Sequence, residues 1–172
     1  MTTGEGTHPT VLVRVGHREA EIDELLAPVI EACWRGGFET LICCQDAGES
    51  NTSWAKKLPH MAAYAEARRG WSFIDFPIDS GLAFLTAVAN AGPRDAFYVR
   101  MTHWAAPQAW DVSIRPMDPA VFRAEQPSEF RLRHLQVLLP GHDLPELTRR
   151  LHEHAAGRRV APAPADWSTV GR

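Results

Sequence analysis

Residues 71–76 read Trp-Ser-Phe-Ile-Asp-Phe, an apolar and aromatic run that predicts a buried β-strand. Helical spacing follows this strand, because Leu82, Leu85 and Val88 fall on one face of a helix that Gly92-Pro93 ends. Asp79 or Ser80 is the predicted cap of that helix. The second half of the chain is therefore predicted to begin with a buried strand and a helix.

Two alternating runs come next, Phe97–Thr102 and Trp110–Arg115, separated by a short loop. Apolar and polar residues alternate in each run, which predicts an antiparallel hairpin. A last strand is predicted over 130–139, where a change of phase indicates a bulge near His134. From Trp71 onward the predicted order is β-α-β-β-β-α, which resembles a ferredoxin-like arrangement with an extra strand.

The ends of these predicted elements carry capping signals. Asp143 with Glu146 forms a predicted capping box for the final helix, which Gly157 ends. In the first half, Pro28 is expected to kink the first helix or to mark a late start. The first half predicts a strand at 10–15, a helix at 22–34, a strand at 38–44, a polar loop at 45–53 and a helix at 54–69.

These elements predict a single α+β domain over residues 10–157. Hairpins dominate its second half, so we expect a mixed, mostly antiparallel sheet with helices mainly on one face. Residues 1–9 are polar and glycine-rich, and residues 158–172 are rich in arginine, proline and alanine. Both ends are therefore expected to be flexible.

The composition is that of an ordinary globular protein. The 172 residues are 45% hydrophobic and carry a formal net charge of −3, which argues against a general attraction to nucleic acid or anionic lipid. No apolar run is long enough for a membrane span, and the first residues do not resemble a secretory signal. We therefore expect a cytoplasmic protein without a membrane partner. The three cysteines, Cys33, Cys43 and Cys44, are odd in number and include an adjacent pair, which predicts no disulfide framework.

The segment from Trp34-Arg35-Gly36-Gly37-Phe38-Glu39-Thr40 through Cys44-Gln45-Asp46 has the pattern W-x-x-G-x-x-T-x-x-x-C-Q-[DE]. It resembles small proteins of actinobacteria and their phages that combine this pattern with a later aromatic strand. That resemblance implies no particular activity. A more remote likeness connects the segment to the start of wybutosine-synthesis methyltransferases. Cys43 stands where that family has serine, and its glycine-arginine continuation is missing, so methyl transfer is not inferred.

The loop Cys43–Asp46 is the predicted working site, because a strand that ends in a thiol and runs into polar residues can present a ligand or a nucleophile. We expect a small-molecule or partner-binding site formed by Cys43, Gln45 and Asp46 and walled by Trp54 and Trp71. The alternative is an enzyme in which Cys44 is the nucleophile, with His17, His60 or His103 as its base. A third interpretation is that Cys44 is a small buried apolar residue.

Motifs for other chemistry are absent: the chain has no phosphate-binding glycine loop, serine-hydrolase elbow or H-E-x-x-H. No cysteine or histidine spacing is typical of a zinc site, so no metal is predicted and the cofactor is undetermined.

A second candidate surface depends on the predicted hairpin. If Phe97, Val99 and Met101 face the core, aromatic and arginine side chains gather on the opposite face of the sheet. Such a face fits a homodimer contact. It also fits a nucleic acid, although the net negative charge of the chain argues against that partner. Its predicted members are Tyr98, Arg100, Trp104, Arg115, Arg131 and Arg133.

Overall fold

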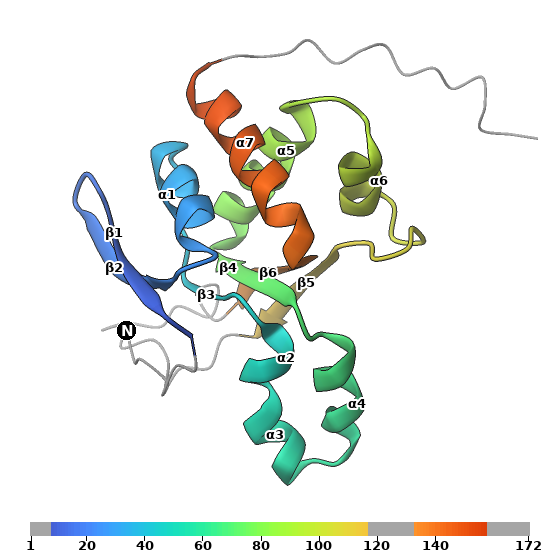
Figure 1. Cartoon of the computed structure of the whole chain (residues 1–172). Coiled ribbons are helices and arrows are strands. Elements are labelled where there is room, and N and C mark those ends of the chain that lie inside the picture. Colours follow the sequence, from blue (N-terminus) through green and yellow to red (C-terminus); the bar gives the residue numbers. More distant parts are fainter. Residues whose placement is uncertain (1–7, 117–132, 158–172) are drawn as a thin grey trace, which may run out of the picture.

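The computed structural model describes residues 8–116 and 133–157, which form two antiparallel sheets and several helices, an α+β fold (Figure 1). Most of the expected flexible ends, 1–7 and 158–172, lie outside these residues, as does Arg131. No helix of the described residues combines the length and apolar character needed to cross a bilayer. The elements are, in order, β1 (Thr10–Val15), β2 (Arg18–Asp23), α1 (Ala27–Arg35), β3 (Ile42–Cys44), α2 (Ala47–Ser50), α3 (Thr52–Lys57), α4 (His60–Ala67), β4 (Trp71–Phe76), α5 (Ile78–Asn90), α6 (Ala96–Thr102), β5 (Asp111–Pro116), β6 (Arg133–Pro140), the 3₁₀ turn η2 (Gly141–Asp143) and α7 (Leu144–Ala155).

The first sheet is the hairpin β1–β2, whose turn places Gly16 at φ 60°. Ala20 and Ile22 of β2 are buried while the glutamates between and before them are exposed, the alternation of a half-buried strand. The predicted start of the first helix at Ile22 is therefore wrong. Helix α1 begins at Ala27 with Pro28 in its first turn. The N–H groups of a first turn have no partner within the helix, so proline is tolerated there.

The second sheet has the strand order β3-β4-β6-β5, and every pair in it is antiparallel. The strand predicted at 71–76 is confirmed as β4, which lies inside the sheet beside β6. The register of β6 runs without interruption from Arg133 opposite Pro116 to Leu138 opposite Asp111. The predicted bulge near His134 is therefore absent from the described part of β6.

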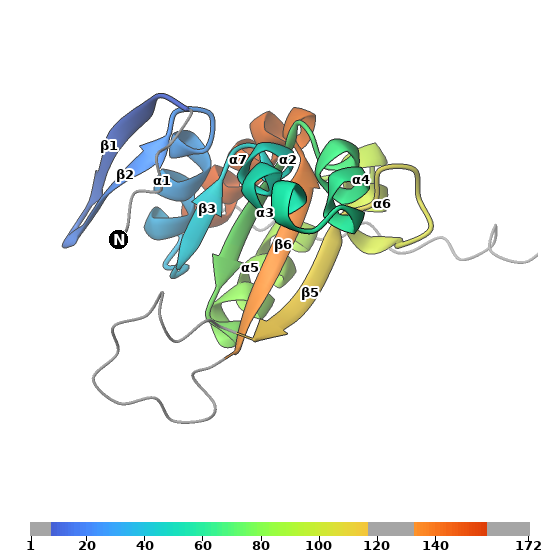
Figure 2. The ribbon, with the colours of Figure 1, turned by 90° about the horizontal axis from the view of Figure 1, so that it is seen from below.

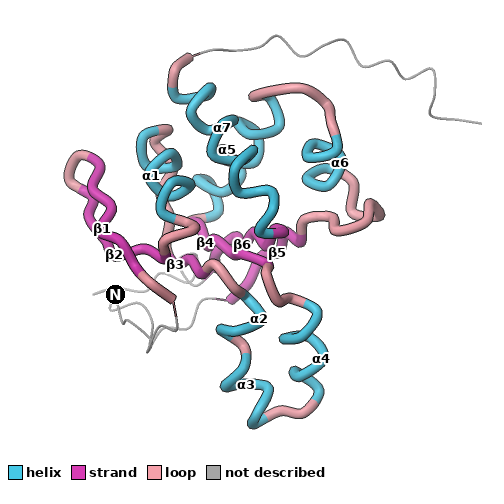
Figure 3. The backbone as a smooth tube through the Cα atoms, in the orientation of Figure 1, coloured by secondary structure: helices cyan, strands magenta, loops and turns pink. Residues whose placement is uncertain are grey.

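Helices α1, α5, α6 and α7 lie on one side of this sheet, and α2, α3 and α4 project from the other side at one end of it (Figures 1 and 3). The main core fills the first side. Ile74 and Phe76 of the sheet pack there with Phe84 of α5 and with Leu147 and Leu151 of α7. On the other face Asp75, Gln136 and Leu138 are also buried, and the view from below shows α2, α3 and α4 at one end of it (Figure 2).

The predicted hairpin is wrong in its first strand, because residues 96–102 form helix α6. The Asp95 carboxylate caps this helix and accepts a 3.1 Å hydrogen bond from the backbone N–H of Tyr98. Phe97 is buried and Val99 is exposed, whereas a strand would have placed them on one face. From Trp71 onward the order is β4-α5-α6-β5-β6-α7, with α6 in the place of the expected extra strand.

Three helices replace the predicted polar loop 45–53 and single helix 54–69. Asp46 caps α2, and Pro59 lies where α3 gives way to α4. The strand predicted at 38–44 is reduced to the three residues of β3.

Neither predicted cap in the second half makes a cap hydrogen bond, although Asp143 does occupy the N-cap position of α7. The Ser80 hydroxyl bonds the backbone of Glu39 instead of capping α5. The buried Asp143 carboxylate makes no cap bond to α7. It accepts hydrogen bonds from the Arg100 guanidinium and from the indole N–H of Trp110, because a buried charge needs these partners more than the helix needs a cap.

Candidate functional site

The two adjacent cysteines of β3 point to opposite faces of the sheet. Cys43 is opposite Ile74 and Cys44 is opposite Phe73 on β4. Cys43 packs against the main core, and burial raises the pKa of its thiol to about 12. Cys43 is therefore part of the core, and the expectation that it contacts a ligand is not supported by its placement.

Gln45 and Asp46 hold the loop in place. The side-chain oxygen of Gln45 accepts a 3.0 Å hydrogen bond from the Leu25 N–H. The backbone N–H of Gln45 donates to the Asp23 carboxylate at 2.9 Å. One Asp46 oxygen caps α2 at the Glu49 N–H, and the other accepts from the Gly70 N–H at 3.1 Å. Both residues thus use their polar groups to fix the position of their neighbour Cys44.

Cys44 is half-buried and lies beside two residues that are distant in sequence. A nitrogen of His8, a carboxylate oxygen of Asp23 and the Cys44 sulfur all lie within 4.8 Å of one another. Asp23 ends β2, Cys44 ends β3, and His8 comes two residues before β1. The hairpin register sets Asp23 opposite Thr10, which brings the residues before β1 to the same end of the molecule.

His8 is held from both directions. Its Nε2 lies 3.1 Å from a carboxylate oxygen of Glu49 on α2. The next residue, Pro9, accepts a 2.9 Å hydrogen bond from the Glu24 N–H through its carbonyl oxygen. His8 and Pro9 are thus fixed, although they belong to the segment 1–9 that the sequence predicts to be flexible.

Histidine nitrogen, cysteine sulfur and carboxylate oxygen are together a zinc ligand set. In a tetrahedral zinc site the ligand atoms are about 3.3–3.6 Å apart, from metal–ligand distances of about 2.0–2.3 Å. Because the three donor atoms lie within 4.8 Å of one another, movements of no more than roughly 1 Å by these half-buried side chains would bring them to that spacing. The spacing along the sequence does not reveal this group, because its three members come from three separate segments.

The environment of Cys44 does not favour a nucleophile. Burial raises the pKa of its thiol, and the nearby Asp23 carboxylate raises it further. A reactive cysteine needs a cation or a base that stabilises the thiolate; His8 is near enough to serve as that base, but its Nε2 lies 3.1 Å from Glu49.

Two of the three predicted bases lie away from Cys44. His17 is exposed in the hairpin turn, at the far end of β1–β2 from Asp23, about 20 Å along a six-residue strand. His103 follows α6 beside β5, on the edge of the sheet opposite to β3. The side chain of His60 lies outside the described part of the structure, as does that of Trp54.

Trp71 is covered from one side by a cation. The guanidinium of Arg68 stacks over its ring at 4.3 Å from the centroid and also pairs with Asp111 at 2.9 Å. Arg68, just after α4, thus connects that helix to Trp71 of β4 and to Asp111 of β5. This packing explains the position of Trp71.

The predicted arginine-bearing sheet face does not exist as one surface. Tyr98 and Arg100 belong to helix α6, and Arg100 is tied to the buried Asp143. Trp104 lies in the connection after α6 and is 92% exposed. Arg115 on β5 and Arg133 at the start of β6 do lie on the sheet, and Arg115 donates to Ser113.

A second cluster of polar side chains lies on the face of the sheet opposite to the main core, and the sequence patterns do not predict it. Asp75 is only 5% exposed; it lies 3.2 Å from His134 Nε2 and accepts a 2.9 Å bond from Gln136. Burial raises the pKa of the Asp75 carboxyl. The other ring nitrogen of His134 is buried and has no hydrogen-bond partner among the described residues. The alternation of β4 and β6 places these side chains together, but neither strand pattern marks them out.

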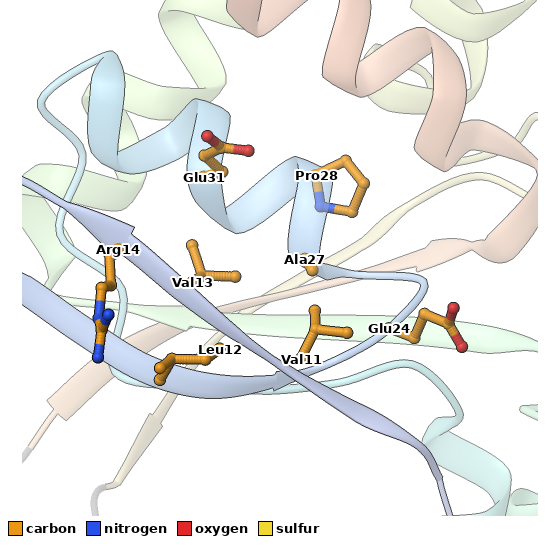
Figure 4. A pocket seen from close by; sticks show the side chains of 8 residues that line it. All are labelled: Val11, Leu12, Val13, Arg14, Glu24, Ala27, Pro28 and Glu31. Atoms are coloured by element: carbon orange, nitrogen blue, oxygen red, sulfur yellow. The ribbon is translucent and has the colours of Figure 1, made fainter.

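A hollow of about 520 Å³ lies between β1 and the start of α1 (Figure 4). Residues such as Val11, Leu12 and Pro28 line it, with Arg14, Glu24 and Glu31 at its border. Arg14 is already paired with Glu19 at 2.6 Å. None of the predicted site residues lines this hollow, and its polar groups do not converge on one point.

Comparisons of the chain with family models, with curated proteins and with solved structures gave no match in any of the three.

Proposed function

We propose that this protein binds a divalent metal ion, zinc by preference, through His8, Asp23 and Cys44. The observation that carries the proposal is the convergence of these three donor atoms within 4.8 Å. They are contributed by the end of β2, the end of β3 and the residue pair before β1, so the fold and not a local motif assembles the group. This assigns a chemical class to the ligand expected at the Cys43–Asp46 loop.

The charges around the site favour a cation. Asp23 supplies a carboxylate inside the group, and Glu49 supplies another against the ring of His8. A carboxylate hydrogen-bonded to a ligating histidine is the usual companion of a zinc site, because it orients the ring and increases its basicity. The hydrogen bonds of Gln45 and Asp46 likewise hold the chain that follows Cys44 in place.

Three protein ligands leave one position of a tetrahedral site for water or for a ligand atom, which is typical of zinc sites that polarise a bound molecule. Zinc bound here would supply Lewis acidity at that open position. His8, Asp23 and Cys44 hold the ion, while Gln45, Asp46 and Glu49 keep these ligands in place.

The test is titration of the full chain with Co²⁺, a spectroscopic substitute for zinc, followed by displacement with Zn²⁺. We expect a thiolate-to-cobalt charge-transfer band, because Cys44 is a ligand. The Cys44→Ser variant should lose the band, whereas Cys43→Ala, at the neighbouring core-facing cysteine, should keep it. His8→Ala should weaken binding by at least about 100-fold, with His17→Ala, at an exposed histidine of the hairpin turn, as the matched control.

Asp23→Asn gives a further control for folding. The amide keeps one oxygen that can accept the Gln45 N–H and replaces the other carboxylate oxygen by NH2, so weaker metal binding by this variant reports the loss of a ligand oxygen and not collapse of the loop. A wild-type chain that gives no cobalt–thiolate band, or whose band survives in Cys44→Ser, would refute the proposal.

A further inference from the structure

β5 is an edge strand of the four-stranded sheet, with β6 on one side (Figure 2). Within residues 8–116 and 133–157 no strand pairs with its other edge. An unpaired edge presents backbone N–H and C=O groups that a further strand can bond, and proteins commonly block such edges with bulges or inward charges. The register of β5 with β6 is continuous, so no bulge interrupts the described edge.

The side chains of β5 expose apolar surface on one face. Val112 and Ile114 alternate with polar residues and are 40% and 60% exposed. Trp104, which is 92% exposed, lies in the connection that leads into the same strand. Exposed tryptophan is enriched at protein interfaces, and an edge strand with exposed hydrophobic side chains is a site at which another chain can pair.

The charges of β5 are complementary to themselves. Asp111 and Arg115 lie two residues on either side of Ser113, on the face opposite to Val112 and Ile114. When two copies of the strand pair antiparallel about Ser113, Asp111 of each copy lies opposite Arg115 of the other. Each Val112 then lies opposite an Ile114. Centring the pairing on Val112 or Ile114 instead places neither charge opposite its complement.

We infer that the protein forms a two-fold symmetric homodimer in which β5 pairs antiparallel with β5 of a second copy, centred on Ser113. The two four-stranded sheets become one continuous sheet. Each Asp111, which already contacts Arg68 of its own chain at 2.9 Å, gains the partner's Arg115 as a second cation. Cross-strand pairs of opposite charge and of β-branched residues each stabilise such a ladder. The interface is separate from the metal site, because β3 and β5 are opposite edges of the sheet.

The test measures the mass of the full chain in solution by light scattering. The wild type should have twice the mass of the 19.1 kDa chain. Asp111→Arg alone and Arg115→Asp alone should both be monomeric, because each places like charges opposite one another at both ends of the ladder. An equimolar mixture of the two variants should recover the dimer mass. One chain then carries two arginines and the other two aspartates, so opposite charges face each other at both ends of the ladder.

Arg14→Asp, on the exposed strand β1 of the hairpin, is the control and should remain dimeric. Ile114→Lys, at a solvent-facing position, should be monomeric with unchanged circular dichroism. A monomeric wild type would overturn the inference. So would a dimer that survives both single charge reversals, a mixture of the two variants that stays monomeric, or a dimer that only Arg14→Asp disrupts.

Discussion

At the scale of single residues, the direction of one side chain decides what a candidate site residue does. Cys43 and Cys44 are neighbours of the same type, yet one packs in the core and the other lies beside Asp23 and His8. The alternation of a strand causes this difference, because adjacent side chains point to opposite faces. Vicinal cysteines at a strand end can be recognised in the sequence, but which of them faces the core depends on pairing with β4.

The buried Asp75 gives a prediction at the same scale. Burial raises the pKa of its carboxyl, so the folded protein holds this proton more tightly than the unfolded chain does. The wild-type free energy of unfolding should therefore contain a contribution that is complete below the ordinary carboxyl pKa of about 3.9 and is lost as the pH rises through the raised value.

Asp75→Asn removes that titration and keeps an oxygen for the Gln136 amide. Urea unfolding at pH 4 and pH 7 should show the variant gaining stability relative to wild type as the pH rises, by about 1.4 kcal/mol for each unit by which the pKa is raised. Parallel pH dependence for wild type and Asp75→Asn would contradict the prediction.

At the scale of elements, the sequence predicts the central strand and the helices that pack on it, and it fails where two periodicities coincide. Phe97 and Met101 are four residues apart and fit both an alternating strand and one face of a helix. The residue that separates the two interpretations is Val99, whose side chain is exposed in α6. A cap at Asp95 decides the outcome, and propensity alone does not reveal whether a cap is used.

Helix α5 gives a prediction about close packing. Gly81 faces the sheet so closely that a Cβ atom there would lie 2.5 Å from Leu135 Cδ2 and 3.1 Å from Phe76 Cβ. Alanine favours a helix by about 1 kcal/mol over glycine, but overpacking a core costs about 1–3 kcal/mol. Gly81→Ala should therefore lower the free energy of unfolding by up to about 2 kcal/mol, measured by urea denaturation.

Leu82→Ala, at the next and 52% exposed position of the same helix, should change stability by no more than about 0.5 kcal/mol. A stabilised Gly81→Ala variant would mean that α5 can move away from β4 and β6 without loss of packing.

At the scale of the whole molecule, the candidate site is where the sequence is least informative. The gathering of polar residues directs attention to the loop after β3, but the partners of Cys44 lie 21 and 36 residues away in the chain, at Asp23 and His8. Such a group follows from three facts together: the hairpin register, the short strand β3 and the attachment of Pro9 to Glu24. No local spacing encodes all three.

The same geometry predicts that a bound metal couples the hairpin to the four-stranded sheet. His8 and Asp23 flank the open end of β1–β2, and Cys44 belongs to β3, so one ion would cross-link the hairpin and the sheet in addition to the contacts of β2 with β3 and of the hairpin with α1. Zinc at about 100 times its dissociation constant should stabilise the folded state by about 2.7 kcal/mol. For a domain of this size the corresponding rise in Tm is about 5–10 °C.

The measurement is thermal unfolding with zinc and with a chelator, in wild type and in Cys44→Ser, together with amide hydrogen exchange of β1 and β2. Zinc should slow exchange in the hairpin of the wild type, because opening the hairpin would then require breaking the metal bonds. Cys44→Ser should show neither the Tm shift nor the added protection. A wild type that binds cobalt through Cys44 but shows no change in hairpin exchange would mean that the ion is held by the loop after β3 without His8 or Asp23.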